Sequence, residues 1–161
     1  MVCVIKKYRY NFDFFKWIKK TELVELSEIN PADDPVRPEL DNTFRTTKGK
    51  KIFGLKYKDE IEGVVCLAFT NELPATVKEL DLMSVNEEDS QIAVAYTLWS
   101  LKKGAGEKIM KELLKYMKKQ NNIDNIMTLS PLTPVATHYH IRNGAKLIKI
   151  NPTTQNFQYY I

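Results

Sequence analysis

The chain has 161 residues, of which 43% are hydrophobic and 27% charged. This composition is typical of a globular protein and not of a disordered or membrane-embedded chain, and the length suffices for one domain with a buried core. The net charge of +4 arises from 24 basic and 20 acidic side chains. Because the bias is mild and no basic stretch is interleaved with aromatic residues, a nucleic-acid partner is not expected.

The start of the chain predicts neither a signal peptide nor a membrane anchor. The opening MVCVIKKYRY has five apolar residues before charge begins, and no apolar run elsewhere approaches a membrane span. Cys3 and Cys66 lie far apart and form no CxxC pair, so neither a disulfide framework nor a thiolate zinc site is indicated. We therefore expect a cytoplasmic protein without a membrane partner.

Residues 1–50 are predicted to form a helical or irregular N-terminal part. The stretch NFDFFKWIKKTELVEL predicts an amphipathic helix from Phe12 to Ile18, followed by a short apolar patch. The next stretch, NPADDPVRPELDN, carries three prolines and three aspartates and indicates an irregular connection.

The middle of the chain predicts strands and a short helix. The segments KIFGLKY and IEGVVCLAFT, separated by a turn, indicate an antiparallel hairpin, and the second is apolar enough to be covered on both faces. A helix is expected within NELPATVKELDLM with Pro74 at its start, then an acidic loop, NEEDS, and another apolar strand, QIAVAYTLWSL.

The last 60 residues alternate helices and strands. In EKIMKELLKYMKK the apolar residues make one helical stripe. A strand NIMTLS, a helix in TPVATHYHIRNG that ends at Gly144, and the closing strands KLIKI and NFQYYI follow. The order of elements predicts an α/β (α+β) fold, with a mixed sheet and helices packed on it, in a single domain over residues 1–161.

A glycine turn between a strand and a helix is a candidate anion site. Gly104 and Gly106 stand where the first helical N–H groups have no partners, so a pyrophosphate would meet backbone donors and the positive end of the helix dipole. Lys102 and Lys103 would add positive charge beside it. On the residues alone, a purely structural loop is equally compatible with this pattern.

The only two histidines, His138 and His140, lie one residue apart. On a strand they would point the same way and could share a metal, but on a helix they lie about 200° apart and cannot. The helical pattern, in which Ala136, His140 and Gly144 recur at steps of four, argues against a metal and separates the two histidines.

Two segments resemble the GNAT superfamily of acyl-CoA-dependent acyltransferases. LKKGAG at 101–106 resembles the cofactor loop Gln/Arg-x-x-Gly-x-Gly/Ala, with Leu101 in place of Gln or Arg, and ATHYHIRNGA at 136–145 resembles the later helix motif. His140 falls where that family carries its tyrosine general acid. The resemblance implies a mostly antiparallel sheet that is splayed at its centre, with helices on both faces.

The resemblance is closer to the catalytic domain of the malonyl-CoA decarboxylases, a GNAT-like family with Leu-Ser-Pro-Ile and Phe-His-Leu-x-Asn-Gly-Ala motifs. The matching segments here are LSPL at 129–132 and YHIRNGA at 139–145, and NFQYY resembles the family's closing Asn-Tyr-x-Tyr. The short spacing between the two motifs is similar to that of compact GNAT-like domains that decarboxylate malonyl groups in polyketide loading modules.

These resemblances imply a site and a reaction. His140 would be the proton donor and Ser130 would hydrogen-bond the malonyl carboxylate or thioester oxygen, with Thr133 as a weaker, substrate-binding candidate in the same polar wall; no metal is required. The acyl-CoA-binding core would span residues 51–161, and its cofactor-binding residues would be Lys102, Lys103, Gly104, Ala105 and Gly106.

Three functions stay open on the sequence. The first is decarboxylation of malonyl-CoA, or of a malonyl group on an acyl carrier protein, because loss of carbon dioxide leaves an enolate that needs a proton and histidine can supply one near neutral pH. The second is N- or O-acyl transfer from acetyl-CoA, for which the acidic NEEDS loop could supply a base. The third is a non-catalytic acyl-CoA-binding module.

Overall fold

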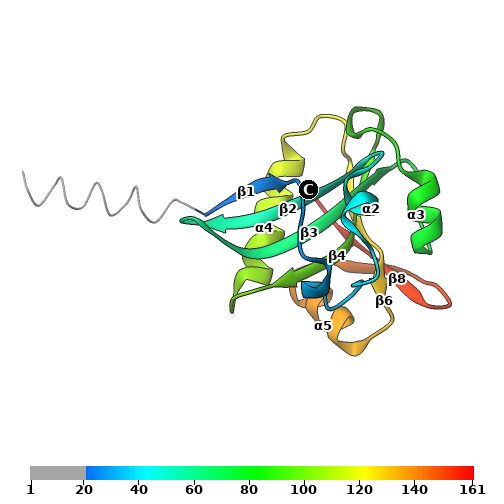
Figure 1. Ribbon diagram of the computed structural model, residues 1–161. Coiled ribbons are helices and arrows are strands. Elements are labelled where there is room, and N and C mark those ends of the chain that lie inside the picture. Colours follow the sequence, from blue (N-terminus) through cyan, green and yellow to red (C-terminus); the bar gives the residue numbers. More distant parts are fainter. Residues whose placement is uncertain (1–20) are drawn as a thin grey trace, which may run out of the picture.

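One mixed sheet organises residues 21–161, the part of the chain that the computed structural model describes (Figure 1). Its strands are β1 (Thr21–Leu26), β2 (Lys50–Tyr57), β3 (Glu60–Thr70), β4 (Ile92–Ser100), β5 (Asn125–Thr128), β6 (Ser130–Pro131), β7 (Lys146–Ile150) and β8 (Thr154–Tyr159). The strand order is β1-β2-β3-β4-β5-β8-β6, with β7 also paired to β8. Only β4 and β5 are parallel, so the predicted mixed, mostly antiparallel sheet is confirmed.

Helices cover both faces of this sheet, as predicted. They are α2 (Asn42–Thr46), α3 (Val77–Met83), α4 (Ala105–Lys118) and α5 (Pro134–Arg142), with short 3-10 turns η1 (Pro31–Asp33) and η2 (Glu87–Asp89). Strand β3 shows why two layers are needed, because its apolar side chains alternate between faces. Val65, Leu67 and Phe69 join the cluster beneath α4, whereas Val64, Cys66 and Ala68 join the cluster beneath α2 and α3 (Figure 1).

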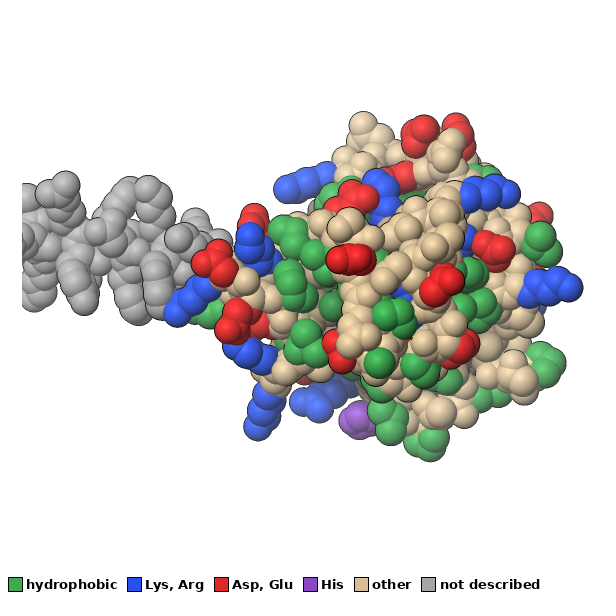
Figure 2. Space-filling model, in the orientation of Figure 1, with side chains coloured by type: hydrophobic (Ala, Val, Ile, Leu, Met, Phe, Trp, Pro, Cys, Tyr) green, Lys and Arg blue, Asp and Glu red, His purple; other side chains and the backbone are tan. Residues whose placement is uncertain are grey.

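Helix α4 buries the stripe that its sequence predicts. Ile109, Met110, Leu113 and Met117 are at most 2% exposed, while its lysines face solvent. Across the face shown in Figure 2, basic and acidic side chains are interspersed. None of the described helices combines the length and apolar character that crossing a membrane requires.

The N-terminal prediction holds for residues 27–49, which are irregular apart from η1 and α2, but it fails for the described residues before them. Residues 21–26 are not part of a helical or irregular segment but form the edge strand β1, paired antiparallel with β2 from Thr21↔Tyr57 to Leu26↔Ile52. Glu22 and Glu25 are both exposed on it, which suits an edge strand. The predicted helix from Phe12 to Ile18 lies outside the described residues. Pro74 does not begin α3 either; Thr76 caps this helix by accepting the Glu79 N–H.

The predicted single strand NIMTLS is interrupted, and this interruption shapes the site. Pairing of β4 with β5 stops at Ala95↔Thr128, with one further bond from the Leu129 N–H to the Ala95 carbonyl at 2.9 Å. Beyond this point β4 runs on to Ser100, while the other strand continues as β6, beside β8. The sheet is therefore splayed between β4 and β6.

Candidate active site

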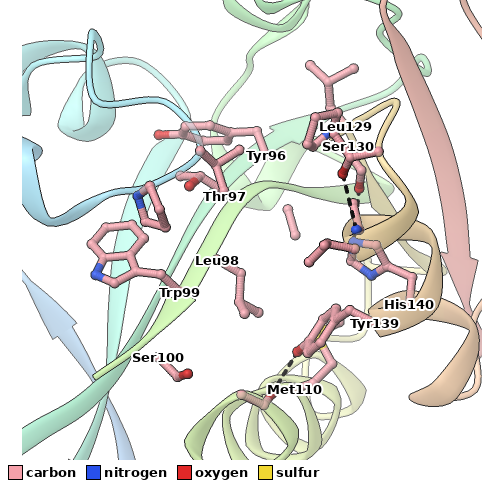
Figure 3. Close-up of a pocket in the computed structure, with 18 residues that line it drawn as sticks. Tyr96, Thr97, Leu98, Trp99, Ser100, Met110, Leu129, Ser130, Tyr139 and His140 are labelled. Atoms are coloured by element: carbon pink, nitrogen blue, oxygen red, sulfur yellow. Dashed lines mark hydrogen bonds between the residues drawn. The ribbon is translucent and has the colours of Figure 1, made fainter. Parts of the chain in front are cut away.

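A cavity of about 390 Å³ opens where the sheet is splayed (Figure 3). Its walls come from β4, the first turn of α4, β6, α5 and the loop after η1. The lining residues are Pro35, Val36, Ala95, Tyr96, Thr97, Leu98, Trp99, Ser100, Gly106, Met110, Leu129, Ser130, Pro131, Thr133, Val135, Ala136, Tyr139 and His140. None of these lining residues is Asp, Glu, Lys or Arg, so the cavity is largely apolar.

Ser130 and His140 meet on this wall. Ser130 lies in β6 and His140 in the last turn of α5, and Ser130 Oγ lies 2.9 Å from His140 Nε2 (Figure 3). Both are nearly buried, at 4% and 8% exposure, and both line the cavity. The structure thus brings together the two residues for which the sequence suggested a catalytic role.

A chain of neutral hydrogen bonds continues from this pair on both sides. Ser130 Oγ donates to Thr128 Oγ1 at 2.8 Å, and Tyr159 OH lies 2.8 Å from His140 Nδ1. With Ser130 donating to Thr128, Nε2–H of His140 donates to Ser130, and Nδ1 accepts the Tyr159 hydroxyl proton. The three side chains Tyr159, His140 and Ser130 then donate in one direction, and the chain ends at Thr128.

Tyr159 was not identified as a site residue from the sequence. It lies in β8, is 2% exposed, and is separated from His140 by 19 positions. The segment NFQYY was recognised only as a resemblance to a closing motif. A buried imidazole needs a hydrogen-bond partner on its second nitrogen, and this need could have pointed to a residue such as Tyr159.

Burial makes His140 neutral. The ring is stacked on Phe157, with centroids 4.9 Å apart, and packs edge-on against Tyr139 at 5.0 Å. Because burial disfavours the charged form, the pKa of His140 falls to about 4. The imidazole is therefore not the partly protonated group that the ordinary histidine pKa suggests, and at neutral pH it carries one N–H and one unprotonated nitrogen, each in a hydrogen bond.

The helix prediction for the two histidines is confirmed. His140 and Ala136 line the cavity from α5, whereas His138 is exposed on another side of this helix. Gly144, with φ of 91°, follows the helix in the left-handed region. Within residues 21–161 no three His, Cys, Asp or Glu side chains gather as metal ligands.

Thr133 lines the cavity but has a structural task as well. Its Oγ1 accepts the Ala136 N–H at 3.2 Å, and it is the N-cap of α5. This bond satisfies one of the free donors of the first helical turn. Its role in binding substrate stays a prediction.

The glycine loop is placed only partly at the cavity. Gly104 is the N-cap of α4 with φ of 83°, Ala105 is buried at 1% exposure, and Gly106 lines the cavity. The Tyr139 hydroxyl donates to the Gly106 carbonyl at 2.7 Å, which ties α5 to the start of α4 (Figure 3).

The two lysines of that loop do not line the cavity. Lys102 Nζ lies 2.6 Å from Glu60 and 3.6 Å from Glu62, so its charge is already opposed by two carboxylates. Lys103 is exposed. A cofactor anion at this loop would therefore depend mainly on the backbone N–H groups at the start of α4.

No protein-family model and no curated protein sequence matches the chain. Solved structures do. The malonyl-CoA decarboxylase from Rhodopseudomonas palustris superimposes with a TM-score of 0.68 at 16% identity, covering 88% of this chain and 60% of that one. The Bacillus subtilis acetyltransferase in complex with CoA gives a TM-score of 0.59 at 14% identity, covering 88% and 99%. The chain has the GNAT fold.

A third GNAT-like structure adds to this agreement. The loading GNATL domain of CurA from Lyngbya majuscula gives a TM-score of 0.58 at 16% identity, covering 75% of this chain and 83% of that domain. All three identities are low, so the likeness concerns the fold. The chain spans 60% of the length of the Rhodopseudomonas decarboxylase. In this GNAT fold, the Ser130–His140 pair lies at the splay of the sheet, near the start of α4.

Proposed function

We propose that this protein acts on an acyl-CoA or acyl-carrier thioester, and that its reaction is the decarboxylation of a malonyl-type acyl group. The observation that carries the proposal is the buried pair Ser130 and His140, 2.9 Å apart on the wall of an otherwise apolar cavity. Enzyme neighbours of the same fold support an acyl-CoA enzyme, and two of them, including the Bacillus acetyltransferase, hold CoA.

The reaction makes three demands on the site. The bond between the carboxylate and the α-carbon breaks, carbon dioxide leaves, and the electron pair becomes the enolate of the thioester. The enolate oxygen needs a hydrogen-bond donor, and the α-carbon then needs one proton. The products are an acetyl thioester and carbon dioxide, and one proton is consumed.

The pair can meet the last two demands. Ser130, whose hydroxyl now donates to Thr128, can turn toward the thioester oxygen while it still accepts from His140. The Nε2–H of His140 then protonates the carbon. A neutral imidazole is a weak acid, but the enolate carbon is a far stronger base, and water restores the lost proton afterwards.

The glycine loop at Gly104 to Gly106 would hold the pyrophosphate of CoA through backbone donors, with Lys102 and Lys103 nearby. Thr133 would contact the acyl end. The cytoplasmic location and an acyl carrier protein as the carrier of the acyl group belong to the same proposal.

Acyl transfer has less support. Such a reaction needs a base for the acceptor, and no lining residue is a carboxylate. The acidic NEEDS segment, which contains η2, does not line the cavity, and its Glu87 lies 2.6 Å from Lys51. A non-catalytic acyl-CoA-binding module would not need the ordered pair at all.

Mass spectrometry after incubation with malonyl-CoA and acetyl-CoA tests the proposal. We expect the wild type to convert malonyl-CoA to acetyl-CoA and to leave acetyl-CoA intact. Free CoA that forms only when an amine is added, without carbon dioxide, would establish acyl transfer instead. Binding of both thioesters with consumption of neither would establish a non-catalytic module.

A further inference from the structure

The Arg37 side chain does not line the cavity, but its positive charge lies directly behind residues that do, at the point where the sheet is splayed. The Arg37 guanidinium bridges the two diverging strands, since Nε donates to the Tyr96 carbonyl at 3.0 Å and Nη2 donates to the Leu129 carbonyl at 3.0 Å. Tyr96 and Leu129 both line the cavity, as do Pro35 and Val36 of the same loop. Leu129 directly precedes Ser130, so the guanidinium is bonded to the backbone beside one member of the proposed catalytic pair.

Hydrogen bonds to Asp34 and Arg45 hold the loop that carries Arg37. Asp34 Oδ1 accepts the N–H groups of Val36 at 2.8 Å and Arg37 at 3.1 Å. The Arg37 carbonyl in turn accepts from Arg45 Nη2 at 2.8 Å. Because Asp34 and Arg45 are almost completely buried, at 1% and 0% exposure, the guanidinium is held in a preorganised position.

The charge of Arg37 is not neutralised by an ion pair. Asp34 is paired with Arg45 at 2.9 Å, and among residues 21–161 no carboxylate lies within salt-bridge distance of Arg37. The lining residues themselves carry no charged side chain. A cation without an ion-pair partner, close behind the wall of a largely apolar cavity, attracts an anion in that cavity, because the low local dielectric screens it weakly.

We propose that Arg37 determines the acyl specificity of this cavity, and that it selects thioesters whose acyl group ends in a carboxylate. The inference rests on the proposed function, since it assumes that the cavity receives an acyl thioester. A neutral acyl group of the same length would fill the apolar space equally well but would gain nothing from the charge. Arg37 therefore acts as a specificity-determining residue beside the pair that performs the chemistry.

Succinyl-CoA and butyryl-CoA are matched probes, because both acyl groups have four carbons and only the first ends in a carboxylate. Neither loses carbon dioxide through an enolate of the thioester, so binding is measured without turnover. We expect the wild type to bind succinyl-CoA about 10-fold more tightly or better, and Arg37→Gln to lose that preference while its butyryl-CoA affinity changes less than about twofold.

Two further variants keep the test decisive. Arg37→Lys retains the charge and should retain most of the preference, and Lys149→Gln removes a charge from the exposed strand β7 and should change nothing. Equal binding of both thioesters by the wild type would overturn the proposal and leave acyl-CoA binding intact, as would equal weakening of both by Arg37→Gln. Failure of the wild type to bind either thioester, or free CoA, would overturn the proposed function as well.

Discussion

Two buried polar clusters lie on opposite sides of the splayed sheet and differ in charge. In the first, Asp34 and Arg45 form an ion pair at 2.9 Å with both side chains fully buried. In the second, Ser130, His140 and Tyr159 form a neutral chain of hydrogen bonds. Of these five residues, only Ser130 and His140 line the cavity.

The difference teaches how each cluster is used. A buried charge is tolerated only when it is paired and hydrogen-bonded, and Asp34 meets this condition with Arg45, the Thr97 hydroxyl and backbone N–H groups. Its bonding capacity is used up, so it holds the loop in place. A neutral imidazole carries a smaller desolvation cost, and its N–H remains able to serve a ligand.

The largest effect is expected from breaking the neutral cluster at its centre. His140→Gln keeps a polar side chain of similar length but cannot deliver a proton as imidazole does. We expect decarboxylation of malonyl-CoA to fall by about 10² to 10⁴-fold, measured as acetyl-CoA formed per enzyme.

The matched control is His138→Gln, because His138 is exposed on the same helix. Its turnover should stay within about twofold of the wild type. Equal activity of the two variants would contradict the role given to His140.

The charged cluster should affect stability instead. Asp34→Ala leaves Arg45 buried without its partner, which typically costs about 3–5 kcal/mol. The midpoint of urea unfolding should fall accordingly. Asp33→Ala, at the exposed neighbouring position, should cost less than about 0.5 kcal/mol. A loss at Asp34 no larger than at Asp33 would show that the ion pair contributes nothing.

The neutral cluster should also make the free energy of unfolding depend on pH, through His140. The folded-state pKa of His140 is lowered to about 4, below the ordinary value of 6.5. The unfolded chain therefore binds this proton first as the pH falls. Stability from the neutral imidazole is fully present above pH 6.5 and is lost between pH 6.5 and pH 4, by about 3 kcal/mol.

The measurement is the free energy of unfolding at pH 7, 5 and 4 for the wild type and for His140→Gln. The difference between the two proteins removes the contribution of the carboxylates, which also titrate in this range. A difference that does not change with pH would mean that folding leaves the pKa of His140 unchanged.

The smallest effect is expected at the end of the neutral chain. Tyr159→Phe preserves the ring in the core but leaves Nδ1 of His140 without its hydrogen bond. We expect a loss of about 1–2 kcal/mol in stability and of about tenfold in turnover. Unchanged turnover with reduced stability would assign Tyr159 a packing role only.

The sequence predicts most of the framework because its signals there are local. The stripe of Ile109 to Met117, the hairpin of β2 and β3, and the capped helix that begins at Pro134 each depend on the spacing of neighbouring residues. His140 and Ser130 could be proposed because each lies in a motif that resembles a known family.

The rest depends on contacts that no local pattern encodes. Tyr159 meets His140 across 19 positions, Arg37 meets Leu129 across 92, and Lys102 is drawn to Glu60 across 42. The strand β1 was not predicted, because its sequence TELVEL is only six residues long and follows a stretch whose apolar spacing indicates a helix. The strand is interrupted at Leu129 because β5 pairs with β4 whereas β6 pairs with β8, and these long-range pairings are not encoded locally.

The central claim is that the Ser130–His140 pair protonates the enolate left by a malonyl thioester. Incubation of the wild type with malonyl-CoA in D₂O tests it most directly, with mass spectrometry of the CoA products. The account predicts that the wild type forms acetyl-CoA whose methyl group carries one deuterium more than hydrogen exchange in an enzyme-free control explains. His140→Gln should form almost no acetyl-CoA. Intact malonyl-CoA after incubation with the wild type, or free CoA in place of acetyl-CoA, would contradict it.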